Sequence, residues 1–499
     1  MFRLTLSDSS DEIEGSTTVT VRFLADGVTQ IALDLASAAN GKGMTVTEVT
    51  STAGNVQYRH EHDRLVLSLS TEGRSGEKRE FTVRYHGVPA SGLRIGNNKY
   101  GERTFFSQNW PDLARQWLPT VDHPYDKASS EFIVIAPSKY QVVANGSLEE
   151  ELDLGDGRRS THWRQSVPIA TWLNDIGVAQ FSARQIGAAS GVPLQTWVYH
   201  QDRDAGMATF DEPARQAMEF YCDHIGPYPY AKLANVEAAG VNGGMEHASA
   251  IFYGEKSVTM KPAVGLVAHE VAHQWFGDSV TEKDWDDVWL SEGFATYFAL
   301  LTAEHYQGRD AFIAGLKTAR DRIFALEKRS PELTIRHNNL SDMGKVLNQM
   351  VYQKGGWTLH MLRGVIGTEK FWAGIRAYYQ TYRDGNASTD DFRRVMEDAS
   401  GMELGWFFQQ WLNRPGFPVI DGSWHYDPEA SRIIVDLAQT QPGEVYRLPV
   451  EIGAGPFVEK VEMTQKTQHF EIKVEKEPPD VTLDPKTWVL MDAHFAKRN

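Results

Sequence analysis

The residues with the clearest capacity for chemistry form the short run His269-Glu270-Val271-Ala272-His273. Residues four apart share one side of an α-helix, so His269 and His273 can present two imidazole nitrogens to one ion. Zinc accepts imidazole ligands, and a single cysteine, Cys222, excludes a cage of thiolates. The run therefore predicts a zinc site whose remaining ligands are carboxylate or water.

A third ligand is predicted at Glu292, which lies in the apolar run WLSEGFATYFALL. An ionised carboxylate on an apolar helix is costly unless a cation neutralises it, and catalytic zinc commonly takes two histidines and one carboxylate. The 18 residues between His273 and Glu292 suffice for a turn and a second helix packed on the first. We expect one Zn²⁺ per chain. Three acidic residues before this helix are candidates to cap it or to orient a ligand imidazole: Asp284, Asp286 and Asp287.

Glu270 directly follows His269, so its side chain projects about 100° further around the helix. It can reach a zinc-bound water without binding the ion, which makes it the predicted general base for hydrolysis of an amide. The competing interpretation is that His269 and His273 are two ordinary core histidines. Burying two imidazoles so close together without a shared cation is costly, which disfavours that interpretation.

The elements that must position these residues fall into three segments. Short β-rich runs and turns alternate up to about residue 190, helical periodicity follows to about residue 412, and short strands then return. We expect an N-terminal antiparallel β-sheet domain over residues 1–190, a mainly α catalytic zinc domain over 191–415, and a small C-terminal β-sandwich over 416–499. The histidine run is expected on a buried helix over 262–277.

Composition limits the other classes of function. A chain of 499 residues with 41% apolar residues predicts an ordered protein of several domains. A formal net charge of −16 disfavours nucleic acid as a partner, and no apolar run is long enough to predict a membrane span. The N-terminus lacks the pattern of a signal peptide but begins inside a strand. We expect a soluble protein, cytoplasmic if the chain is complete and exported if a signal was removed.

Beyond the zinc run, the chain resembles the aminopeptidase N-like zinc metallopeptidases, a gluzincin family that also includes the leukotriene hydrolase. The motifs that carry the resemblance are HEVAHQWFG, WDDVWLSEGFATY, VNGGMEH, VYQKGG, SVPIATWLNDIGVAQF and FFQQWLNRPGFPV. The resemblance implies an α+β multidomain fold with a thermolysin-like catalytic domain. It also implies that the chain removes single residues from the N-terminus of peptides. The large helical C-terminal domain of many relatives is not expected, because the chain ends after the small β domain.

The resemblance also implies roles for the segment Gly243-Gly244-Met245-Glu246. Such a segment lies along the substrate as a strand edge, and Glu246 would hold the free α-amine. A carboxylate facing that ammonium restricts cleavage to the first peptide bond. His247 stands where the family usually has asparagine, so the support of the Glu246 carboxylate is left open.

Three further positions take implied roles from the same family. Tyr352 in VYQKG matches a tyrosine that donates its hydroxyl to the oxyanion. Gln108 resembles a glutamine beside the pocket for the first side chain, and Met245 would form another wall. Many relatives carry a second acidic amine anchor where this chain has Trp110, and what replaces that anchor is open.

Together these features predict a zinc-dependent aminopeptidase that hydrolyses the N-terminal peptide bond by attack of a zinc-bound water. Its expected partners are peptides with a free N-terminus. Three alternatives remain: an endopeptidase, an epoxide hydrolase, and a non-catalytic peptide-binding scaffold. The sequence indicates neither the preferred first residue nor the oligomeric state.

Overall fold

The computed structural model describes residues 1–336 and 342–498. Residues 337–341, in the predicted catalytic domain, and residue 499, in the predicted C-terminal domain, lie outside the described residues. The chain forms two compact units. The first comprises Met1–Trp285 with Tyr379–Ser388, and the second comprises Asp286–Tyr378 with Thr389–Asn499. The division into domains at residues 190 and 415 stays a prediction.

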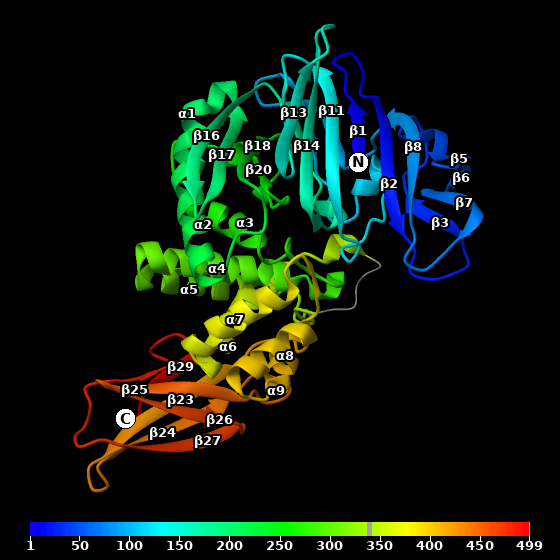
Figure 1. Cartoon of the computed structure of the whole chain (residues 1–499). Helices are drawn as coiled ribbons and strands as arrows, with labels where there is room; N and C mark the ends of the chain where they lie inside the picture. The colour runs from blue at the N-terminus through cyan, green and yellow to red at the C-terminus, as the bar shows by residue number, and fades with distance from the viewer. Residues whose placement is uncertain (337–341, 499) are drawn as a thin grey trace. The chain divides into compact units, whose positions relative to one another are not determined.

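The N-terminal part of the first unit is built on an eight-stranded sheet (Figure 1). The strands run in the order β13-β14-β11-β1-β2-β8-β4-β5, and the pairs are antiparallel except for the parallel pair β1 and β11. Alternate residues face the core, as a sheet with one covered face requires. The strands are β1 (Phe2–Thr5), β2 (Ile13–Arg22), β4 (Gly43–Ser51), β5 (Gly54–Asn55), β8 (Lys78–Val88), β11 (Ala128–Pro137), β13 (Ser147–Asp153) and β14 (Arg158–Ile169).

Two smaller sheets share the core of this large sheet. One has the order β12-β15-β10-β9 and the other the order β3-β7-β6. Their core includes the fully buried side chains of Leu65, Phe105 and Val134, and Trp163 is 2% exposed. The strands are β3 (Val28–Asp34), β6 (Gln57–Glu61), β7 (Arg64–Gly73), β9 (Leu93–Asn97), β10 (Arg103–Ser107), β12 (Gln141–Ala144) and β15 (Ile176–Ala179).

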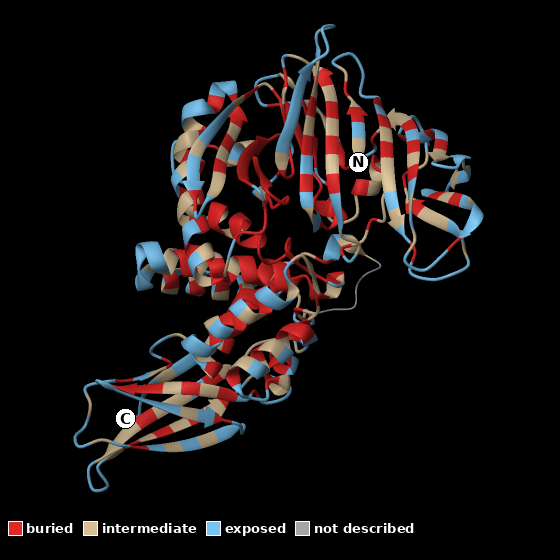
Figure 2. Cartoon of the chain, viewed as in Figure 1, coloured by how far each residue is buried: buried red, intermediate tan, exposed pale blue. Residues whose placement is uncertain are grey.

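A five-stranded sheet and its helices complete the first unit. The strand order is β16-β17-β18-β20-β19, with β17, β18 and β20 parallel and β19 antiparallel at the edge. Every residue of β18 and β20 is buried, as expected for parallel strands covered on both faces (Figure 2). The elements are β16 (Phe181–Ala189), β17 (Val192–Tyr199), α1 (Arg203–Gly206), α2 (Glu212–His224), β18 (Leu233–Ala238), β19 (Gly244–Met245), β20 (Ala250–Gly254), α3 (Val264–His273) and the pair β21 (Val280–Glu282) and β22 (Gly385–Ala387).

The N-terminal sheets and the five-stranded sheet are joined by hydrogen bonds to main-chain oxygens. Asn145 Nδ2 donates to the Ala248 carbonyl at 2.8 Å, and Lys232 Nζ donates to the Ala144 carbonyl at 2.9 Å. Lys127 Nζ reaches two consecutive carbonyls beyond α3, at 2.9 and 2.8 Å. Because all three donors are largely buried, each bond also satisfies a polar group that would otherwise be costly.

The helical part of the second unit centres on α4, whose side chains are buried over most of its length. A Cβ added to Gly293 on α4 would lie 2.9 Å from the carbonyl carbon of Gly355, so the two helices meet backbone to backbone. None of the helices described is both long and apolar enough to cross a membrane. The elements are α4 (Trp289–Gln307), α5 (Arg309–Glu327), the π-helical turn η8 (Met350–Lys354), α6 (Gly355–Ile366), α7 (Thr368–Tyr382), α8 (Thr389–Ser400) and α9 (Gly405–Leu412).

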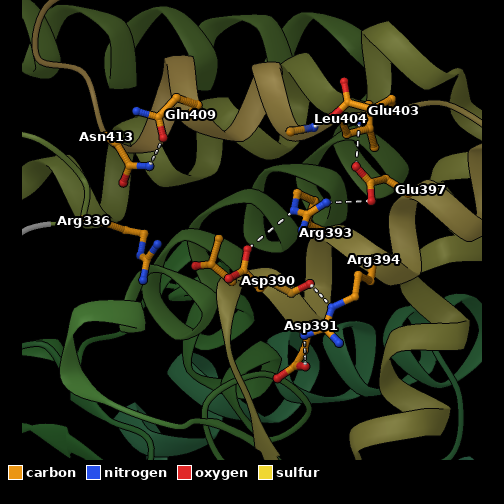
Figure 3. A network of polar contacts seen from close by, with 12 residues as sticks. Arg336, Asp390, Asp391, Arg393, Arg394, Glu397, Glu403, Leu404, Gln409 and Asn413 are labelled. Carbon is orange, nitrogen blue, oxygen red and sulfur yellow. Dashed lines mark hydrogen bonds and ion pairs between the residues drawn. The ribbon is translucent and has the colours of Figure 1, made fainter.

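A glutamate on α8 accepts a hydrogen bond from the residue at the start of α9, which connects the two helices (Figure 3). Arg393 pairs with Glu397 one turn along the helix, at 2.7 Å. The other oxygen of Glu397 accepts the Leu404 amide at 2.8 Å. Leu404 is the N-cap of α9, so Glu397 satisfies a main-chain donor where that helix begins.

Two small sheets form the C-terminal part of the second unit. They have the orders β27-β24-β23-β29 and β26-β25-β28, and they bury Trp424, Val435 and Ile452. The strands are β23 (Val419–Asp427), β24 (Arg432–Gln439), β25 (Leu448–Ala454), β26 (Phe457–Met463), β27 (Thr467–Lys473), β28 (Val481–Leu483) and β29 (Asp492–Lys497). The predicted succession of a β-rich N-terminal part, a helical middle and C-terminal β-sheets is confirmed.

Candidate active site

The predicted metal run lies on α3 in the first unit. The sequence predicted a helix over 262–277, but the α-helix spans only Val264–His273. Tighter turns follow, and Gly277, with a φ of +118°, then turns the chain away. The Tyr221 hydroxyl of α2 donates to the Ala268 carbonyl at 2.8 Å, which fixes α3 against its neighbour.

The two histidines of α3 face one another through their Nε2 atoms, which are 3.2 Å apart. His273 Nδ1 lies 3.2 Å from the Phe276 carbonyl oxygen. Because a carbonyl only accepts, Nδ1 carries the proton and Nε2 of His273 keeps its lone pair. Two nitrogens bound at about 2.05 Å to one tetrahedral zinc are about 3.3 Å apart. The spacing of the pair therefore fits a shared zinc ion.

The predicted base, Glu270, is buried on α3 and faces the edge strand β19. A Cβ built on Gly244 would lie 2.3 Å from both Cδ and Oε1 of Glu270. Only glycine allows the carboxyl group to come so close to the main chain. Glu246, Glu270 and His273 each offer a ligand atom, and these atoms all lie within 4.8 Å of one another. The first unit thus brings the histidine pair, the predicted base and the predicted amine anchor together.

The side chain of Gln274, which the sequence did not single out, ties Glu246 to the end of α3. Its Nε2 donates to the Glu246 carbonyl at 2.9 Å and to Asp278 Oδ2 at 2.8 Å. Its Oε1 accepts the Ser249 amide at 2.8 Å. Since Gln274 is fully buried, its hydrogen bonds fix the turn that carries Glu246. Its position directly after His273 was the available sequence signal.

Two titratable groups lie behind this turn, the buried Asp278 and the half-buried Lys127. Burial raises the pKa of the Asp278 carboxyl well above its ordinary value, and repulsion by Glu246 adds to the shift. Burial lowers the pKa of Lys127 to about 7, while its ammonium donates to the carbonyls of Asp278 and Ser279. Both groups are biased toward their neutral forms, which lessens the cost of enclosing them beside α3.

His247 does not support the Glu246 carboxylate through its side chain. The imidazole is fully buried and stands edge-on to the Phe252 ring, with centroids 4.8 Å apart. Neither ring nitrogen has a hydrogen-bond partner among the described residues. Burial lowers the pKa of His247 to about 3, so the ring is neutral. The support of Glu246 instead comes from Gln274, through the main chain.

The remaining predicted residues of the first unit have different surroundings. Gln108 is exposed directly after β10, and its main-chain N–H donates to the Gly92 carbonyl at 2.7 Å. Met245 is buried on β19. Trp110 stands edge-on to Trp285 with ring centroids 5.4 Å apart. Trp110, for which the resemblance left a replacement anchor open, thus makes an aromatic contact.

Glu292 and Tyr352 belong to the second unit. Glu292 is 6% exposed in the first turn of α4, and Tyr352 is half-buried in the π-helical turn η8. These elements pack closely, because a Cβ on Gly293 would lie 3.2 Å from the Val351 carbonyl oxygen. The small residue after Glu292 therefore allows α4 to approach the turn that carries Tyr352. Turns of this π-helical type are frequent at functional sites.

The acidic residues before α4 have different partners. Asp287 is buried, accepts a 2.6 Å hydrogen bond from the Thr389 hydroxyl and pairs with Arg336 at 3.0 Å. Asp284 accepts the amide of Trp285 at 2.8 Å. Asp287 thus anchors the entry to α4 without capping it, since the N-cap position makes no side-chain hydrogen bond.

Comparison with solved structures identifies the class of fold. The structure of an M1 zinc metallopeptidase from Deinococcus radiodurans matches with a TM-score of 0.71 and 26% identity, covering 84% of this chain and 93% of that chain. A variant of a two-domain M1 zinc metallopeptidase bound to L-tryptophan matches with a TM-score of 0.73 and 25% identity, covering 84% and 94%. The fold is therefore that of the M1 zinc metallopeptidases.

Two family models match most of the chain: Peptidase M1 N-terminal domain over residues 2–173 and Peptidase family M1 domain over residues 211–411. The chain belongs to the M1 peptidase family, as its motifs predicted.

Curated sequences show the same relationship at lower coverage. Glutamyl aminopeptidase from Sus scrofa is 28% identical over 327 residues, 62% of this chain and 34% of that protein. Tricorn protease-interacting factor F2 from Thermoplasma acidophilum is 27% identical over 397 residues, 76% of this chain and 49% of that protein. The chain thus spans about a third to a half of the length of these relatives.

The buried imidazole of His247 predicts a dependence of stability on pH. Between about pH 6.5 and pH 3 the unfolded chain binds a proton on this residue that the folded chain does not bind. The contribution is complete above pH 6.5 and is lost as the pH falls. His247→Leu should therefore reduce the loss of unfolding free energy between pH 7.5 and pH 5 by about 2 kcal/mol, measured by urea denaturation. If wild type and variant lose the same unfolding free energy between pH 7.5 and pH 5, His247 takes up a proton in the folded protein as readily as in the unfolded chain.

Proposed function

We propose that the chain is a zinc-dependent aminopeptidase that hydrolyses the first peptide bond of peptides with a free N-terminus. The observation that carries the proposal is the convergence of two kinds of group in the first unit. A histidine pair spaced for one metal ion lies beside two buried carboxylates, Glu270 and Glu246. Metal-assisted hydrolysis of an amide uses a metal ion and one base, and a second carboxylate suits the ammonium of a substrate. The glutamyl aminopeptidases among the relatives support the same activity.

The proposed zinc ligands are His269, His273 and Glu292. The donor set of two imidazoles and one carboxylate suits catalytic zinc. Burial of Glu292 on the apolar helix α4 supports the assignment, since its charge is costly there without a cation. Zinc, when bound, polarises the scissile carbonyl and lowers the pKa of a water molecule.

Glu270 is proposed as the general base. It takes the proton of the attacking water and passes it to the nitrogen of the leaving amine, so that it ends the cycle ionised again. Its close contact with the main chain at Gly244 supports this role, because it limits where the carboxyl group can move. Because such a base is already oriented, little free energy is needed to orient it in the transition state.

Glu246 and the residues before it are proposed to bind the substrate. Glu246 would pair with the α-ammonium, and the main chain of Gly243, Gly244 and Met245 would lie along the peptide. Strand β19 is the last strand of its sheet, so a peptide can add to its outer edge. The hydrogen bond from Gln274 to the Glu246 carbonyl supports a fixed distance between the anchor and the metal helix.

The remaining roles follow from chemistry and from membership of the family. Tyr352 is proposed to donate its hydroxyl to the oxyanion that forms on the scissile carbonyl. Gln108 and Met245 are proposed as walls of the pocket for the first side chain.

The proposed function predicts a selective response to acetylation of the substrate. The purified protein should contain one zinc per chain by elemental analysis and should hydrolyse leucine p-nitroanilide but not its N-acetyl derivative. A chelator should abolish the activity, and added zinc should restore it. Cleavage of both compounds would indicate an endopeptidase. Cleavage of neither by zinc-loaded protein would contradict the proposal and favour the epoxide hydrolase or the binding scaffold.

The assigned roles predict two different kinetic defects. Glu270→Gln should retain one zinc per chain while kcat falls by a factor on the order of 10² to 10⁴, as expected for loss of a general base. Tyr352→Phe should lower kcat about 100-fold with little change in KM, because its bond strengthens in the transition state. Steady-state kinetics with leucine p-nitroanilide measure both. Near-normal turnover by either zinc-loaded variant would remove the corresponding role.

The close contact between Gly244 and Glu270 predicts that one methyl group can impair catalysis. Gly244→Ala should displace the Glu270 carboxyl group and lower kcat about 100-fold, since small misplacements of a reacting group have effects of this size. Gly265→Ala is the matched control, because the same change on α3 points into open space. It should leave kcat within about twofold. Equal kinetics for the two variants would contradict the positioning of Glu270 by Gly244.

A further inference from the structure

We propose that a basic hollow in the first unit binds a carboxylate group of the peptide substrate, an inference that rests on the proposed aminopeptidase function. The hollow has a volume of about 370 Å³ and is lined by Arg94, Lys42, Gln108 and Gly240, among others. Its wall combines the β9–β10 region of the N-terminal part with the turn that leads to β19.

The fixed charges of the hollow leave it positive. Its one acidic lining residue, Asp11, pairs with Arg103 at 2.6 Å. Arg94 and Lys42 are exposed, and neither side chain has a hydrogen bond or ion pair with any residue that the structure describes. Two uncompensated cations in one concavity contrast with the net charge of −16 on the whole chain. The hollow therefore favours an anionic ligand, although the net negative charge of the whole chain repels anions.

The exposed side chain of Arg94 lies against the main chain of Gly240. Arg94 lies on β9 opposite Phe106 of β10, and its side chain extends over Gly240. A Cβ at position 240 would lie 2.5 Å from Cδ and 2.7 Å from Nη1 of Arg94. Gly240 also has a φ of +85°, so both its conformation and its contact with Arg94 favour glycine. The glycine thus leaves room for the guanidinium at this edge of the hollow.

The hollow adjoins the proposed path of the substrate. Gly240 lies three residues before Gly243, where the proposed peptide-binding segment begins. Gln108, proposed to line the pocket for the first side chain, belongs to the wall of the hollow and adds an amide donor. A substrate group that reaches Gln108 would therefore meet the hollow that Arg94 lines.

A carboxylate is the ligand chemistry that these donors recognise. The planar fork of an arginine binds a carboxylate through two parallel hydrogen bonds, and charge-assisted bonds of this kind are about twice as strong as neutral ones. Two parts of a peptide can supply the group: an acidic first side chain, or the C-terminal carboxylate of a short peptide. The shared chemistry is the proposal, and the substrates distinguish the two sources.

The test compares substrates that differ in one carboxylate, using the zinc-loaded protein. One arm sets glutamyl p-nitroanilide against glutaminyl p-nitroanilide. The other sets tri-alanine against its C-terminal amide. In one arm the carboxylate should raise kcat/KM about tenfold or more, as expected for a hydrogen bond between charged groups. A preference confined to the first arm assigns an acidic first side chain, and one confined to the second assigns the C-terminus.

Variants assign the preference to the hollow. Arg94→Gln should abolish the preference, mainly through a higher KM, while leaving leucine p-nitroanilide within about twofold. Arg22→Gln is the matched control, since Arg22 is exposed at the end of β2, away from the hollow. It should leave the preference intact. An equal loss on all substrates, or a wild-type enzyme without preference in either arm, would overturn the inference.

A binding measurement separates failure of this inference from failure of the proposed function. If leucine p-nitroanilide is not hydrolysed, the proposed function fails, whatever the preference. The zinc-loaded Glu270→Gln protein is then titrated calorimetrically with glutamyl and glutaminyl peptides and with tri-alanine and its amide. Tighter binding of a carboxylate-bearing member, lost on adding Arg94→Gln, supports the hollow as a carboxylate site. Equal affinities within both pairs overturn it.

Discussion

Two imidazole rings whose Nε2 atoms lie 3.2 Å apart can share one cation, and this requirement governs the first unit. Sharing an ion requires that both rings are held in orientation. Helix α3 provides the spacing, and the Phe276 carbonyl selects the protonated nitrogen of His273. The Tyr221 hydroxyl holds the helix itself against α2. The neighbouring carboxylates then lie at distances defined by one rigid element.

Close approach to the main chain is used again wherever a predicted functional group must be placed. Gly244 admits the Glu270 carboxyl group, and Gly240 admits the Arg94 guanidinium. In the second unit, the residue after Glu292 is a glycine that lets α4 meet η8 and α6. A Cβ at any of these glycines would meet the neighbouring group and force it to move. The lack of a side chain on these glycines thus helps to set where the neighbouring groups lie.

Local patterns predicted much of this arrangement. The sequence shows the four-residue spacing of His269 and His273 and the change from strand to helical periodicity. It also shows that the Glu292 carboxylate lies in an apolar helix, where burying its charge is costly. The role of Gln274 was missed, because its partners come from a turn far away in sequence. The early end of α3 was also missed, since residues 274–276 continue in tighter turns. The parallel pairing of β1 with β11 depends on the same kind of distant contact.

The joint between the N-terminal sheets and the five-stranded sheet bears on how the family can change. Asn145, Lys232 and Lys127 bond there to carbonyl oxygens, which every amino acid provides. Substitutions at the accepting positions therefore leave the acceptors in place, and only the donors need to persist. Such a joint tolerates substitution at the positions that supply the carbonyl acceptors but not at the positions that supply the side-chain donors. Loss of Asn145, Lys232 or Lys127 would therefore break a bond of the joint, which a substitution at an accepting position does not do.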